Sequence, residues 1–141
     1  STKIPIPSLD LVIQLGNKFL VVRRKKNPAK DKYTFIGGVL HKKIIINTAI
    51  KKIIKREINI HLNRKAKLID VKKFSFLKDF SGKNKDLEYF SAIFHTKISK
   101  KEYENIKLDT EHSHYKLMDK NKLLKNNKVL NQVKKVIKDN F

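Results

Sequence analysis

The sequence predicts a mixed α/β domain of the α+β type, in which strands precede and surround one central helix. Three patterns indicate it: an N-terminal β-hairpin, an amphipathic helix in the middle of the chain, and two paired strands that lead to a second amphipathic helix. The strands come in groups, so a repeated strand–helix–strand winding is not expected. The 141 residues match the size of one domain, which we expect to span residues 1–141.

Each expected element follows from its residue pattern. Apolar and β-branched runs that end at turn signals such as Gly16-Asn17 predict strands. Apolar residues three and four positions apart predict helices, as in the isoleucine stripe that follows the expected N-cap Asn47. In chain order, the expected elements are strands at residues 9–15, 19–23 and 33–36, a helix at 48–59, strands at 67–76, 86–96 and 115–118 with a turn at 80–84, a short helix capped by Asp119, and a helix at 127–139.

The charge of the chain is its most unusual compositional feature. Lysine and arginine number 34 against 13 acidic residues, which gives a net charge of +21. Such a charge favours nucleic acid or another polyanion as a partner. Only four of the 34 cations are arginine, however, the residue preferred for forked contacts to phosphate. A joint abundance of lysine, isoleucine and asparagine is also typical of the codon bias of an AT-rich genome. A selected basic surface and codon bias therefore both stay open as explanations of the charge.

Several classes of protein are excluded by composition. The chain has no cysteine, which rules out disulfides, thiolate catalysis and cysteine-ligated zinc. No apolar run approaches the roughly 20 residues that a membrane span requires. No charged start followed by an apolar stretch marks a signal peptide. We therefore expect a cytoplasmic protein that does not enter a membrane.

Gly37-Gly38 and Glu57 are the first two candidates for a functional site. The glycines lie between a strand and the central helix, where the backbone can approach a metal or a phosphate closely; a simple tight turn is the alternative. Glu57 is the only acidic residue between Asp31 and Asp70. It can be a ligand for a hard cation such as Mg²⁺ or a partner in a surface ion pair.

Residues 109–115 form the third candidate, a run of two carboxylates, two histidines and a tyrosine. Histidine titrates near neutrality and suits general-base catalysis, and Glu111 beside it can bind a metal ion. We expect His112 and His114 to face opposite ways, so that at most one of them serves a site. A polar loop without a function is the alternative.

The basic run at residues 23–26 is the fourth candidate. Arg23 and Arg24 lie at the end of the second expected strand and can hold a diphosphate by forked hydrogen bonds. A solvated basic loop explains the same residues equally well.

Taken together, these segments resemble the Nudix hydrolases, and within them the GDP-mannose mannosyl hydrolase branch. The Nudix box, G-x5-E-x7-R-E-U-x-E-E-x-G-U with U a bulky aliphatic residue, is matched by residues 37–60. The box is degenerate: Glu57 is the one glutamate that remains, and Lys52 stands in place of the arginine. Beyond the box, the resemblance covers about residues 5 to 126. It rests on segments 8–13, 19–24, 27–29, 33–38, 80–82 and 109–115, together with Tyr89.

The resemblance implies a Nudix-like α/β/α sandwich with a mixed central sheet. It also implies Mg²⁺-dependent hydrolysis of a nucleotide sugar such as GDP-mannose, with Mn²⁺ as an alternative metal. In that branch, a general base directs water to the anomeric carbon of the sugar and releases GDP and the free sugar. The branch is dimeric, so a homodimer is expected.

The roles of individual residues are likewise implied by the resemblance. His112 is the expected general base, and Arg24 is expected to steady the charge of the leaving diphosphate. The expected metal ligands are Glu57, Glu111 and the carbonyl of Gly37. The expected substrate-binding residues are Asp10, Arg23, Lys52 and Tyr89.

A second hypothesis is a Nudix-like domain that has kept the fold and lost the chemistry. It would be a basic module that binds RNA or a ribonucleoprotein, because the charge is high and most box carboxylates are missing. The placement of the lysines distinguishes the two: a single basic stripe favours RNA, and lysines on every face favour compositional bias.

Overall fold

β1 (Ile6–Leu15) organises the sheet in the computed structural model, which describes residues 4–27, 29–76 and 86–141. Residues 8–11 of β1 pair antiparallel with β4 (Ile36–Val39), whereas residues 14 and 15 pair antiparallel with β2 (Lys18–Arg24). On its other side β1 pairs in parallel with β6 (Leu87–Lys97). The sheet is therefore mixed, as predicted, and it opens where β1 changes from one neighbour to the other.

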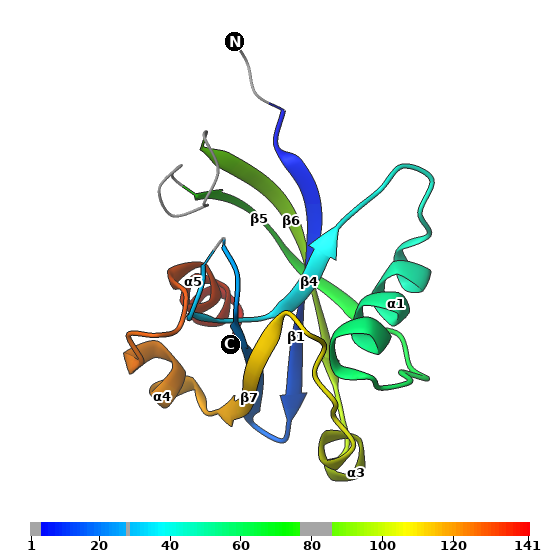
Figure 1. Cartoon of the computed structure of the whole chain (residues 1–141), viewed down its shortest axis with the longest axis vertical. Coiled ribbons are helices and arrows are strands. Elements are labelled where there is room, and N and C mark those ends of the chain that lie inside the picture. The colour runs from blue at the N-terminus through cyan, green and yellow to red at the C-terminus, as the bar shows by residue number, and fades with distance from the viewer. Residues whose placement is uncertain (1–3, 28, 77–85) are drawn as a thin grey trace.

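Helices cover both faces of this sheet (Figure 1). α1 (Ile46–Ile58) packs on one face and α5 (Asn131–Asn140) on the opposite face, which is the predicted α/β/α sandwich. β7 (His112–Met118) pairs with the outer side of β2, and β5 (Lys67–Phe76) pairs with β6. The remaining elements are β3 (Tyr33–Thr34), α3 (Lys100–Glu104) and α4 (Lys120–Lys125).

Two apolar clusters hold the layers together, one on each face of β1. Leu9, Leu11 and Ile13 pack with the isoleucines of α1, and Val12 packs with Val133 and its neighbours on α5. Successive side chains of a strand point to opposite faces, so an apolar run such as 11–13 supplies both clusters. Burial on both sides explains why this strand is well predicted from composition.

The central helix differs from its prediction at its start. α1 begins at Ile46, and its N-cap is Ile45, whose side chain makes no capping hydrogen bond; the prediction of Asn47 as N-cap is wrong. The carbonyl of Ile45 accepts the hydrogen bond from the backbone N–H of Ala49, so Asn47 already lies inside the helix and cannot cap it. At the other end, Asn59 has a left-handed backbone with φ of 57°. Asparagine tolerates that conformation, so it can end the helix where the Nudix box has glycine.

Other boundaries shift by a few residues. β7 begins at residue 112, three residues before the predicted strand, and α5 begins at 131, four residues after the predicted helix start. Asp119 caps α4 through its side chain, as predicted. α3 was not predicted, although Ser99 and Glu102 form a capping box at its start. The predicted turn at 80–84 lies outside the described residues.

The described lysines lie on both faces of the sandwich. Lys51, Lys52 and Lys55 are exposed on α1, and Lys135 and Lys138 are exposed on α5, across the sheet. Within the part of the chain that the structure describes, they therefore form no single basic stripe, and this favours compositional bias. The described helices are also all too short or too polar to cross a membrane.

The two neighbouring glycines of β4 should respond very differently to substitution. A Cβ on Gly37 would overlap the carbonyl oxygen of Leu9 and lie 2.6 Å from Oδ1 of Asp10. A Cβ on Gly38 would instead meet the flexible Arg56 guanidinium at 3.3 Å. Gly37→Ala is expected to lower the free energy of unfolding by at least about 2 kcal/mol, and Gly38→Ala by less than about 1 kcal/mol. Urea unfolding of both variants measures this, and equal losses would contradict the close packing of β1 and β4.

Candidate active site

A cavity of about 340 Å³ lies between β4 and the end of β2, lined by residues 8–10 of β1 and by Arg24; its size is at the low end for ligand pockets. Because the sheet is split there, residues from α1 and from α5 reach the same cavity although the helices lie on opposite faces. The charged side chains that line it are Asp10, Arg24, Arg56, Glu57 and Glu111. The apolar lining includes Phe35, Phe74, Val133 and Val136. The cavity therefore combines a charged region with an apolar one.

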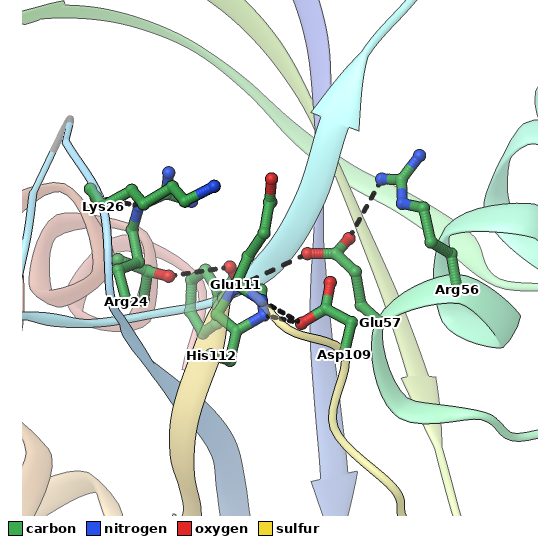
Figure 2. A network of polar contacts seen from close by, with 9 residues as sticks. Arg24, Lys26, Arg56, Glu57, Asp109, Glu111 and His112 are labelled. Atoms are coloured by element: carbon green, nitrogen blue, oxygen red, sulfur yellow. Dashed lines mark hydrogen bonds and ion pairs between the residues drawn. The ribbon is translucent and has the colours of Figure 1, made fainter.

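Three titratable side chains meet beside the charged region (Figure 2). Glu57 comes from the last turn of α1, Asp109 from the loop before β7, and His112 is the first residue of β7. Nδ1 of His112 lies 2.7 Å from Oδ1 of Asp109, and Nε2 lies 3.8 Å from Oε1 of Glu57. The backbone N–H of Asp109 also donates to the carbonyl of Glu57, which joins the loop to the helix.

A β-bulge gives His112 its direction. In a regular strand, residues two apart face the same way. Here Arg23 pairs with His114 and Arg24 pairs with His112, so Ser113 is an extra residue in β7. The bulge turns His112 toward Glu57 and the interior, whereas His114 stays exposed. The two histidines therefore face differently, as predicted, and the cause is the bulge.

The electrostatics of Glu57 favour a bound cation. Burial raises the pKa of this carboxyl to about 7; the positive charge of Arg56 and a backbone hydrogen bond from Gly37 oppose the rise, and Asp109 adds to it. Arg56 Nη2 lies 3.3 Å from Glu57 Oε2 but is itself largely exposed. A buried carboxylate that is only partly compensated gains from a cation nearby. The carboxylates and imidazole nitrogen, within 4.8 Å of one another, are a suitable donor set for a divalent metal ion.

Asp10 and Tyr89, which the resemblance implies as substrate-binding residues, also line this cavity, and so does Arg24, the expected partner of the leaving diphosphate. Ser91 Oγ donates to Asp10 Oδ2 at 2.6 Å. Burial raises the pKa of Asp10 to about 6, while the Ser91 hydrogen bond and the charge of Arg24 oppose the rise. Burial also raises the pKa of Tyr89, again opposed by Arg24. One guanidinium thus acts on both groups.

The other predicted residues are distributed unevenly. Gly37 and Glu111 line the cavity. The Glu111 side chain leads away from the His112 ring in Figure 2, and its carboxylate is outside the described cluster of possible metal ligands. Arg23 instead lies 3.9 Å from Asp31, and Lys52 is exposed on α1; neither is among the described residues that line the cavity.

Sequence reasoning missed Asp109, Arg56 and the residues that α5 contributes to the site. Asp109 orients His112, and its position three residues earlier was a weak signal because the loop conformation was unknown. Arg56 replaces a box glutamate and lines the cavity, whereas the predicted Lys52 does not. Its position beside Glu57 on the same helix was the available signal. The contribution of α5 had no signal in the sequence.

Comparisons with known proteins identify the fold. No family model matches the sequence. The MutT protein of Methanosarcina mazei has a TM-score of 0.80 at 16% identity, covering 99% of this chain and 95% of that one. The MutT Nudix hydrolase of Burkholderia pseudomallei has a TM-score of 0.76 at 14% identity, covering 96% of this chain and 98% of that one. The Nudix domain of Shewanella oneidensis NrtR, complexed with ADP ribose, has a TM-score of 0.70 at 11% identity, covering 97% of this chain and 86% of that one.

The chain therefore has the Nudix hydrolase fold, as the resemblance implied. One curated protein is similar in sequence: the low-salt glycan biosynthesis protein Agl8 of Haloferax volcanii is 23% identical over 116 residues, which are 82% of this chain and 72% of Agl8.

Asp10→Asn should stabilise the protein in a pH-dependent way. The folded state raises the pKa of Asp10 from 3.8 to about 6, so the wild type loses stability as the pH rises through this range. Asparagine keeps an acceptor for Ser91 and carries no charge. The variant is expected to gain up to about 3 kcal/mol above about pH 7 and nothing below about pH 4.

Urea unfolding across this pH range measures the effect. Glu104→Gln, which removes an exposed carboxylate on α3, is the control for the loss of one negative charge. A variant less stable than wild type near neutral pH would contradict the raised pKa.

Proposed function

We propose that the chain is a divalent-metal-dependent hydrolase of a nucleotide sugar, with GDP-mannose as the expected substrate. The observation that carries the proposal is the cluster of buried Glu57, half-buried Asp109 and buried His112 beside a cavity that also holds Arg24. This combination supplies a metal site, a proton acceptor and a cation for a diphosphate. ADP ribose in the Shewanella structure and the glycan role in the name of Agl8 agree with a nucleotide-sugar substrate.

The proposed reaction is displacement at the anomeric carbon. The oxygen of water forms a bond to that carbon, and the bond from the carbon to the diphosphate oxygen breaks. A general base takes the proton of the water, and the electron pair leaves with the nucleoside diphosphate. Arg24 and Arg56 would face the charge that develops on the leaving group. His112 and Glu111 are the two candidates for the base.

Glu57 is the central ligand in the proposed metal site, near the Gly37 backbone. Mg²⁺ is the metal that the sequence leads us to expect, with Mn²⁺ as the alternative. When bound, such an ion polarises phosphoryl oxygens and stabilises negative charge. Orientation of the substrate and acceptance of the proton are then tasks of the protein side chains. A homodimer and a cytoplasmic location stay predictions from the sequence.

The apolar region of the cavity is the proposed site of the nucleobase. Phe35, Phe74 and Val136 line it, and Gln132 of α5 is a polar side chain beside them. The half-buried amide of Gln132 can form hydrogen bonds with the edge of a nucleobase. An apolar ligand in this place would leave the amide without a hydrogen-bond partner. An RNA-binding module is not favoured, since the described lysines lie on both faces of the sandwich.

Hydrolysis of GDP-mannose in oxygen-18-labelled water tests the reaction. Attack at the anomeric carbon puts the label into the free sugar, and attack at phosphorus puts it into a phosphate group, either of the nucleotide or of a sugar phosphate. The proposal expects label in mannose, metal dependence, and a loss of about 10²–10³ in kcat for Arg24→Ala. Arg64→Ala, at a surface ion pair with Glu102, is the control. Label in a phosphate group would refute displacement at carbon, and no turnover would refute the hydrolase.

Gln132→Ala tests the base site by binding alone. Calorimetry with GDP and with pyrophosphate, both with Mg²⁺, is expected to give about fivefold weaker GDP binding and unchanged pyrophosphate binding, because one hydrogen bond is lost. Asn131→Ala changes the exposed neighbour on α5 and is the matched control. Equal effects on both ligands would contradict this location of the base.

A further inference from the structure

His112 and Glu111 differ in access to the cavity. The His112 side chain is 1% exposed, and it is not among the described residues that line the cavity. Glu111 is exposed and lines the cavity. A general base must reach the water that it deprotonates. Glu111 meets this condition directly, and His112 does not.

His112 is held in the manner of a metal-binding histidine. Its Nδ1 lies 2.7 Å from the Asp109 carboxylate, an acceptor that favours the tautomer with the proton on Nδ1, and its Nε2 faces Glu57. A carboxylate that fixes the tautomer and direction of an imidazole is the usual support of a histidine ligand.

The distance to Glu57 points the same way. Nε2 of His112 and Oε1 of Glu57 are 3.8 Å apart, which is too long for a hydrogen bond. Ligand bonds of about 2.1 Å allow two donor atoms on one ion to lie up to about 4.2 Å apart. Both side chains are buried, at 1% and 6% exposure, so neither is freely solvated.

We infer that His112 binds the metal ion through Nε2 together with Glu57, that Asp109 positions the imidazole, and that Glu111 is the general base. This exchanges the roles that the resemblance implied for His112 and Glu111. The assignment of Glu111 rests on the proposed hydrolase function, whereas the assignment of His112 concerns metal binding alone.

The inferred ligand set also specifies the kind of metal. Mg²⁺ prefers oxygen ligands, whereas an imidazole nitrogen favours Mn²⁺ and, more strongly, Zn²⁺. The metal bound most tightly is therefore expected to be a transition metal ion, with Zn²⁺ ahead of Mn²⁺ and Mn²⁺ ahead of Mg²⁺.

Isosteric variants separate the two ring nitrogens. Asparagine at 112 keeps a donor near the place of Nδ1 and has no atom at the place of Nε2. His112→Asn is therefore expected to keep the contact to Asp109 and to weaken Mn²⁺ and Zn²⁺ binding at least tenfold by calorimetry. Asp109→Asn is expected to weaken it by about 10- to 100-fold. His114→Asn, on the same strand and exposed, is the matched control and should bind as wild type.

A measurement on the wild-type chain avoids any effect of substitution on folding. Long-range proton–nitrogen NMR of the five histidines during Zn²⁺ titration follows each ring nitrogen, with His112→Asn and His114→Asn giving the assignment. The inference expects Nε2 of His112 to shift while Nδ1 stays protonated. A His112 signal that does not change at saturating Zn²⁺ would overturn it.

Turnover separates the ligand from the base. Glu111→Gln is expected to lower kcat by about 10²-fold or more with Mn²⁺ affinity within twofold of wild type. His112→Asn with unchanged Mn²⁺ affinity and the larger loss of kcat would restore His112 as the base and overturn the inference. If no nucleotide sugar is hydrolysed, the proposed function and the role of Glu111 both fail, and the binding data alone decide the role of His112.

Discussion

The change of neighbour along β1 is the constraint on which the site depends. A continuous sheet would keep α1 and α5 on separate faces, and their side chains would not meet. Because β1 pairs with β4 near one end and with β2 near the other, the sheet opens between these strands. Glu57 from α1 and Val136 from α5 consequently line one cavity. The same opening gives the cavity its charged region and its apolar region.

The buried carboxylate of Glu57 is central to the charged region. The Nudix box has several glutamates, and this chain keeps only Glu57, at the inner side of the last turn of α1. Its burial is unfavourable without compensation, and the Arg56 guanidinium compensates it only in part. Asp109 and His112 approach it from the β7 loop. Possible metal ligands that the helix lacks are therefore supplied by residues from a distant part of the chain.

Much of the fold could be predicted because its strands and helices bury apolar side chains at regular spacing. The failures have local causes. Asn47 is a good capping residue by type, but α1 already begins at Ile46, so Asn47 lies inside the helix. Glu57 could be predicted as a site residue because it is isolated among lysines. The importance of Asp109 could not be predicted, because it depends on the conformation of the loop that brings its carboxylate to 2.7 Å from His112.

The sequence patterns by themselves determined most of the strands and helices, because periodicity and residue type act locally, whereas the sandwich and most of the polar residues of the cavity were implied by the resemblance to Nudix hydrolases. Only the tertiary structure decided which of these residues share a site. The bulge at Ser113 turns His112 inward, the helix surface exposes Lys52, and α5 closes the apolar region of the cavity. Each of these depends on contacts between segments far apart in the chain. Local sequence patterns do not predict individual contacts between distant segments.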